Sequence, residues 1–148
     1  MSKVMDKSDI VRNFSGCIHC SQLVFGQWAE ELGLSEEEAR KIAGPFGGGC
    51  FVGDVCGCVA GALMALGYKF GHFELGDTEG NARMVEKVKV FEERFVEENG
   101  AFCCKDLTGY DFSKEGQFEK AVSAGITVDK CPGYVNSALS ILDDLMQE

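Results

Sequence analysis

The chain has 148 residues and a mass of 16.0 kDa, which suits one globular domain, residues 1–148, and leaves little room for two. Its basic and acidic residues give 14 − 24 = −10, a charge that repels nucleic-acid phosphates and anionic lipids, so neither is an expected partner. No apolar run approaches the roughly 20 residues that cross a bilayer. The first residues lack the apolar stretch of an export signal, so we expect a cytoplasmic protein.

Cysteine is unusually frequent, with eight residues in the chain. Eight cysteines in a short secreted protein would indicate four disulfides, but 45% of this longer chain is hydrophobic, enough for a core. In a reducing compartment, an excess of thiols indicates metal or iron–sulfur ligation, or thiol exchange.

Residues typical of helix starts and helix ends divide the chain into a series of predicted helices. Ser35 and Glu38 form a capping box, and glycines such as Gly33 and Gly67 suit helix ends. Apolar residues recur every three or four positions in 78–98 and 132–147, while Ile126–Val128 is the only short strand candidate. We therefore predict an all-α bundle of about five or six helices, over residues 17–33, 35–43, 54–68, 78–98, 114–124 and 132–147.

Two cysteine positions open predicted helices. Cys17 and Cys20 form a CxxC pattern whose sulfurs share one helix face, and the face of Cys20 continues into apolar residues. Cys131 precedes Pro132, which suits a first helical turn, and it starts a buried stripe. These cysteines are expected to face the core.

The remaining cysteines lie in the middle of the chain. Cys50 follows a glycine triplet, and Cys56 and Cys58 fall in the next predicted helix, which Asp54 could cap. Residues two apart on a helix diverge by about 200°, so these two should not serve one site unless the helix starts late. The vicinal pair 103–104 is expected to point apart.

One cysteine from each of the four groups 17/20, 50/56/58, 103/104 and 131 would supply four thiolates from separate elements. That is the number needed for a tetrahedral metal or an iron–sulfur cluster. The remaining thiols allow a second four-thiolate site or one larger cluster.

Several motifs together resemble the C_GCAxxG_C_C family of redox-active proteins, over about residues 14–146. They are Cys20-Ser21-Gln22, Phe46-Gly47-Gly48-Gly49, the run from Cys56 to Gly67, Cys104-Lys105-Asp106-Leu107-Thr108-Gly109 and Cys131-Pro132. The resemblance implies a prokaryotic protein, frequent in anaerobes, with signature cysteines at Cys20, Cys56, Cys104 and Cys131. A related domain occurs in split-Soret cytochromes c, where an iron–sulfur centre has been proposed.

This chain differs from the family pattern by four additional thiols, and their presence favours an enlarged or second centre. They are Cys17, Cys50, Cys58 and Cys103. No CxxCH motif is present, so no haem is expected. The triplet 47–49 lacks the Lys-Ser/Thr of a phosphate loop and is interpreted as a close backbone approach that could donate amides to cluster sulfides. His19 and His72 are expected to be structural.

The leading hypothesis is an iron–sulfur protein in which the four signature and the four additional cysteines hold one enlarged cluster or two clusters. It would transfer or store electrons, or reduce a small molecule at the cluster. A thiol–disulfide oxidoreductase, a structural-zinc interaction module and inert buried thiols are the alternatives. The charge predicts a basic redox partner, and Gly57-x-x-x-Gly61 would permit a close helix pair within the chain or in a homodimer. The sequence points to no catalytic pair.

Overall fold

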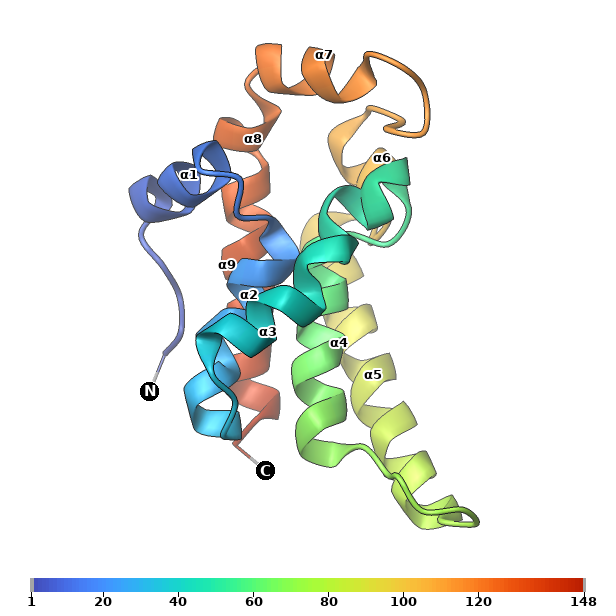
Figure 1. Cartoon of the computed structure of the whole chain (residues 1–148). Coiled ribbons are helices and arrows are strands. Elements are labelled where there is room, and N and C mark those ends of the chain that lie inside the picture. The colour runs from blue at the N-terminus through green and yellow to red at the C-terminus, as the bar shows by residue number, and fades with distance from the viewer. Residues whose placement is uncertain (1, 148) are drawn as a thin grey trace.

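The structure, a computed structural model, describes residues 2–147, and the regular secondary structure of this part is all helical (Figure 1). Its helices are α1 (Lys7–Ser15), α2 (Cys20–Leu32), α3 (Glu36–Ala43), η1 (Gly44–Phe46), η2 (Gly49–Gly53), α4 (Gly57–Phe70), α5 (Thr78–Asn99), α6 (Cys104–Thr108), α7 (Gln117–Ser123), α8 (Ile126–Asp129) and α9 (Cys131–Leu145). Within residues 2–147 there is no strand, only an isolated antiparallel bridge between Val55 and Cys103. The all-α class is confirmed, with more helices than the five or six predicted.

The long helices α2, α4, α5 and α9 form the bundle, and their apolar stripes fill its core (Figure 1). On α5, Phe91 and Phe95 are fully buried and stack with their ring centroids 6.0 Å apart. On α9, Val135, Ala138 and Leu142 have no exposed surface. These stripes follow the helical period read from the sequence, because burial of one face is what stabilises such helices.

Helices α2 and α4 approach closely because α4 carries glycine where they touch. A Cβ atom at Gly61 would lie 2.6 Å from the Ser21 carbonyl oxygen and 3.2 Å from the Val24 Cβ. Real side chains do not tolerate the first distance, so only glycine fits there. The small-residue pattern therefore pairs two helices of the same chain.

Three predicted elements begin or fold differently from expectation. Helix α2 starts at Cys20 rather than at residue 17, because Cys17 has a φ of 69° in the left-handed region. Helix α4 starts at Gly57 rather than at 54. The strand predicted at 126–128 is wrong. These residues form α8, which starts after the left-handed Gly125 (φ 82°) and packs against α9.

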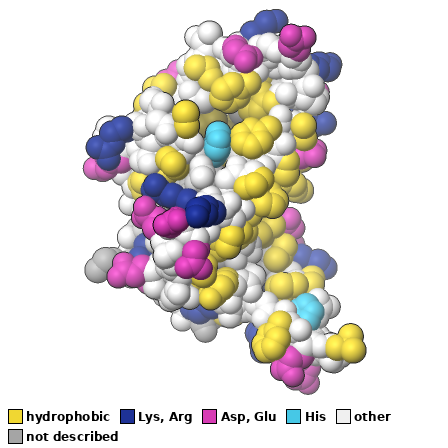
Figure 2. Space-filling model, in the orientation of Figure 1, with side chains coloured by type: hydrophobic (Ala, Val, Ile, Leu, Met, Phe, Trp, Pro, Cys, Tyr) yellow, Lys and Arg dark blue, Asp and Glu magenta, His cyan; other side chains and the backbone are white. Residues whose placement is uncertain are grey.

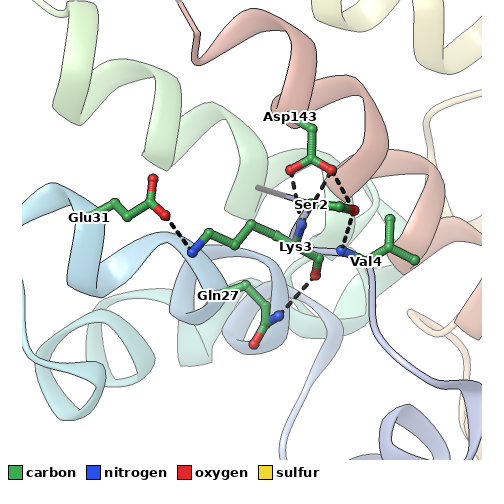
Figure 3. A network of polar contacts seen from close by, with 6 residues as sticks. All are labelled: Ser2, Lys3, Val4, Gln27, Glu31 and Asp143. Carbon is green, nitrogen blue, oxygen red and sulfur yellow. Dashed lines mark hydrogen bonds and ion pairs between the residues drawn. The ribbon is translucent and has the colours of Figure 1, made fainter.

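The N-terminal arm is tied to the bundle by polar contacts (Figure 3). The Asp143 carboxylate on α9 accepts hydrogen bonds from the Ser2 hydroxyl (2.9 Å) and from the Lys3 backbone amide (3.0 Å). The Lys3 ammonium pairs with Glu31 on α2 at 2.6 Å, and Gln27 donates to the Lys3 carbonyl at 2.9 Å. The arm therefore joins α2 to α9 at the edge of the bundle.

The connection between α4 and α5 projects from the lower end of the molecule (Figure 1). Phe73 is 92% exposed and Leu75 is fully exposed there, and Figure 2 shows hydrophobic side chains on this projection and on the upper half of the same face. No helix within residues 2–147 is both long and apolar enough to span a bilayer.

Candidate thiol centre

Five cysteines interact with one another at the upper end of the bundle, and we call them the thiol centre. They are Cys20, Cys56, Cys58, Cys104 and Cys131. Cys20, Cys104 and Cys131 are the first residues of α2, α6 and α9, and Cys56 is the N-cap of α4. The four helix N-termini thus each bring one signature cysteine to the centre. Unpaired amides and the helix dipole make a helix N-terminus favourable for a thiolate.

Cys20 is the member of the centre on which negative charge is best stabilised. Hydrogen bonds from the Cys56 and Cys58 thiols, and from the backbone amides of Gly48 and Ser21, hold the pKa of Cys20 well below its ordinary value. They outweigh burial, which by itself would raise that pKa. Cys20 is therefore the thiol of the centre whose ionisation is most favoured.

The other thiols of the centre have raised pKa values. The hydrogen bond to Cys20, followed by burial, raises the pKa of Cys56, while burial is the main cause of the raised pKa of Cys58. Burial and the charge of Cys20 raise the pKa of Cys104 to about 12, and the same causes raise the pKa of Cys131 to about 12. Several buried thiols around one anion form a site that a cation would stabilise, since positive charge favours thiolates.

Cys56 and Cys58 reach the same site because α4 starts late. Cys56 has extended backbone angles (φ −51°, ψ 135°) and precedes the first helical residue, Gly57. The angle of about 200° that separates residues two apart within a helix therefore does not apply to this pair. Cys58 is 1% exposed and Cys56 is 5% exposed. This meets the condition under which the sequence allowed both to serve one site.

A backbone bridge sets Cys56 beside Cys104. The Cys56 amide donates to the Phe102 carbonyl at 2.8 Å, and the Cys104 amide donates to the Asp54 carbonyl at 2.6 Å. The side chain of Asp54, predicted to cap α4, makes no such cap, since Cys56 takes that position. The bridge joins chain segments almost fifty residues apart and holds two signature cysteines without any side-chain contact.

Glycines let the backbone approach Cys20 closely. A Cβ atom at Gly57 would lie 2.4 Å from the Cys20 Sγ and 3.0 Å from the Phe46 carbonyl oxygen. The space that a side chain would fill is occupied by the sulfur, so Gly57 is required by the position of Cys20.

The glycine triplet leads into a left-handed turn beside the centre. Four successive residues, Gly48, Gly49, Cys50 and Phe51, have φ between 56° and 63°. Such a conformation costs roughly 1–2 kcal/mol for each non-glycine residue, so its persistence requires support from neighbouring contacts. The turn presents the Gly48 amide to the Cys20 sulfur, as the predicted close backbone approach requires.

The other three additional cysteines differ in exposure. Cys17, expected to face the core with Cys20, is exposed, as is Cys50. Cys103 is half-buried and close enough to the buried Cys104 to raise the pKa of that thiol, and the expected divergence of this vicinal pair stays a prediction. The structure therefore brings together the four signature cysteines and Cys58, and it does not gather all eight. Ligation by Cys17, Cys50 and Cys103 stays a prediction.

The histidines and carboxylates do not complete a single-ion site. The His19 ring packs edge-on against Phe51 with centroids 5.0 Å apart, and His72 follows α4 at the end remote from Cys56. Within residues 2–147, no group of three or more His, Cys, Asp or Glu side chains is arranged to hold a metal ion. The thiols as they stand are thus not closed around one ion such as tetrahedral zinc.

Two residues of the site could not be found from the sequence. Tyr134 lies one turn beyond Cys131 and donates to the Leu107 carbonyl at 3.0 Å. Burial raises the pKa of Tyr134, and the nearby Cys131 and Cys56 raise that pKa further, which places the ring beside the centre. The other is Thr108, whose hydroxyl donates to the Cys104 carbonyl at 2.8 Å.

Fold and site together define an all-helical protein with a buried thiol centre at converging helix N-termini. The chain belongs to the family described as "Putative redox-active protein (C_GCAxxG_C_C)", which it matches over residues 18–145. The suspected resemblance is thereby confirmed, and with it a redox role. No curated protein and no solved structure matches the chain.

Proposed function

We propose that this redox protein binds an iron–sulfur cluster at Cys20, Cys56, Cys104 and Cys131, and that it transfers or stores electrons there. The observation that carries the proposal is the convergence of four helix N-termini, each with one signature cysteine at or next to its first residue. A cluster bound there would accept and release single electrons, with a potential set by hydrogen bonds to sulfur and by burial.

The donor set fits such a group in number and chemistry. Iron–sulfur clusters take four thiolates, so the thiols of the centre would release their protons to solvent as their sulfurs bind iron. Cluster ligands need not close around one ion, which agrees with the absence of a single-ion arrangement among residues 2–147. Because a single-ion arrangement is absent among the described residues, the structure offers no support for the structural-zinc alternative.

The surrounding residues prepare the site for negative charge. The Gly48 and Ser21 amides already donate to the Cys20 sulfur, and such donors to sulfur raise a reduction potential. Cys58 is a fifth thiol within the centre and is available as an alternative ligand. The aliphatic residues of the bundle below exclude water from this side.

A thiol–disulfide oxidoreductase is the second candidate, favoured by the contact of Cys20, whose pKa is lowered, with Cys56 and Cys58. In this reaction, Cys20 would attack a disulfide of a partner protein and release one partner thiolate. The Cys56 thiol, giving up its proton, would then attack the mixed disulfide and release the second partner thiolate. The partner disulfide is reduced by two electrons, and a Cys20–Cys56 disulfide is formed.

We further propose a basic redox partner, since the chain carries a net charge of −10. Opposite charge speeds association at low ionic strength and loses this effect as salt screens it. The rate of electron exchange with that partner should therefore fall as salt is added. A rate independent of salt would contradict this proposal.

One experiment separates the two functions. The full chain is purified without oxygen, and its absorbance and its iron, zinc and acid-labile sulfide contents are measured. The iron–sulfur proposal predicts a brown protein that loses most of its iron in Cys20→Ala and Cys131→Ala. Cys50→Ala, at the exposed left-handed turn, is the comparison: it should keep the iron held by the signature cysteines, and any iron lost there would assign ligation to the additional thiol.

Unchanged iron in both Cys20→Ala and Cys131→Ala would overturn the ligand assignment. A colourless protein without iron, in which one disulfide forms on mild oxidation and fails to form in Cys20→Ala, would favour the oxidoreductase. Stoichiometric zinc without sulfide would contradict both.

A further inference from the structure

We propose that Tyr134 is a positioning residue that holds Cys104 and Cys131 in register at the thiol centre. The effect of Tyr134 on a bound cluster rests on the proposed function. The hydrogen bond of Tyr134 is a property of the chain itself and does not depend on a cluster. The Tyr134 hydroxyl donates to the Leu107 carbonyl at 3.0 Å. Tyr134 lies three residues after Cys131, and Leu107 lies three residues after Cys104.

The two ends of this hydrogen bond occupy equivalent places on their helices. Residues three apart on a helix lie on one face, about one turn from each other. Because the acceptor is a backbone carbonyl, the bond ties the backbone of α6, three residues after Cys104, to the first turn of α9. It limits how far the starts of the two helices can move apart without touching either sulfur.

Helix α6 depends on such outside contacts because it is only five residues long. A helix this short has too few internal hydrogen bonds to form by itself. On one side the bridge between Cys104 and Asp54 joins it to the start of α4 (2.6 Å). The Tyr134 hydroxyl joins the other side of α6 to α9. Cys104 on α6 is therefore held in place by contacts to both α4 and α9.

The ring of Tyr134 has a separate structural role that the experiment must leave intact. It packs against Phe95 with ring centroids 6.4 Å apart. Tyr134→Phe keeps that ring and removes only the hydroxyl. Tyr68→Phe is the matched control, since Tyr68 is 55% exposed on α4 and distant in sequence from every cysteine of the centre.

The first measurement is the alkylation rate of each cysteine by iodoacetamide, followed by mass spectrometry in the reduced, metal-free full chain at constant pH. Loss of one hydrogen bond should raise the rates at Cys104 and Cys131 about 3- to 10-fold in Tyr134→Phe. Cys20 should change by less than about twofold, and Tyr68→Phe should match the wild type. Equal acceleration at every cysteine, or no change at Cys104 and Cys131, would overturn the inference.

The second measurement uses the protein as purified without oxygen. If the wild type contains iron, Tyr134→Phe should alter its electron paramagnetic resonance spectrum at equal iron content, which a change in stability alone would not do. An unaltered spectrum would overturn the role of Tyr134 toward the bound group. If the wild type contains no iron, the proposed function fails while the alkylation rates still decide the positioning role.

Discussion

The bundle core and the thiol centre are stabilised in different ways. In the core, long helices bury side chains such as Phe91 and Phe95. Asp77 accepts a hydrogen bond from the Gly80 amide at the start of α5, and Gly100 (φ 89°) ends that helix. At the thiol centre, the starts of α2, α4 and α9, the short helix α6 and the left-handed turn are held by backbone hydrogen bonds and by close contacts to glycine.

This difference teaches that stability and site geometry depend on separate residues. Removing buried atoms from the bundle should lower the free energy of unfolding. In the molecules that remain folded, the arrangement of the cysteines should be unchanged. Adding atoms beside Cys20 should disturb the site at a smaller cost in stability. The predictions below test that separation.

The largest effect is expected from Phe91→Ala. Phe91 is fully buried and stacks on Phe95, so the cavity should lower the free energy of unfolding by about 3–5 kcal/mol in urea denaturation. The exposed Glu86→Ala on the same helix should change it by less than about 0.5 kcal/mol. If Phe91→Ala costs no more than Glu86→Ala, the bundle does not supply the stability assigned to it.

Gly57→Ala should act on the centre instead. The new Cβ would lie 2.4 Å from the Cys20 Sγ, and relief of this clash should cost about 1–3 kcal/mol of stability. Displacement of Cys20 should also slow its alkylation relative to the other cysteines, because the thiolate would lose its donors.

Gly67→Ala is the matched control on the same helix. Nothing lies within 4 Å of the position that its Cβ would take, and alanine should stabilise the helix by roughly 0.5–1 kcal/mol. Equal alkylation patterns in Gly57→Ala and Gly67→Ala would show that the contact between Gly57 and Cys20 does not set the site.

A smaller effect should appear with alkaline pH in the reduced, metal-free protein. The pKa of Cys131 is raised from 9.0 to about 12 in the folded protein, so the unfolded chain releases this proton first. Stability from this thiol is complete below pH 9 and is lost as the pH rises toward 12, at about 1.4 kcal/mol per pH unit.

Urea denaturation of the wild type and of Cys131→Ala at pH 9 and 10.5 isolates this contribution. The variant should lose less stability over that interval by about 1–2 kcal/mol. Parallel losses in the two proteins would show that Cys131 is not buried beside the Cys20 charge. Cys17→Ala, at an exposed position, should match the wild type.

The bundle was predictable because its helices follow local rules. The stripes of α5 and α9 have the helical period, and Ser35 caps α3 through the Glu38 amide as its sequence indicates. Helix α1 was not predicted, since its nine residues offer few apolar positions from which to read a period and only Ile10 is buried. The strand at 126–128 was mistaken because β-branched residues favour strands, whereas the left-handed Gly125 starts a single helical turn there.

The thiol centre was predictable only in part. The sequence separated the cysteines into groups on different elements, and the structure brings one from each group together. The sequence could not show that Cys58 joins them, because the position of Cys58 depends on Cys56 lying before helix α4 rather than in it. Nor could it find Tyr134, whose partner is a backbone carbonyl and leaves no sequence signal.

The bridge between Val55 and Cys103 encloses the whole α4–α5 hairpin. The hairpin can form from local contacts, but the centre also needs Cys20 from before it and Cys131 from after it. During synthesis on the ribosome, the site therefore cannot be assembled until residue 131 has left the exit tunnel. Incomplete or truncated chains would display loose thiols and no working centre.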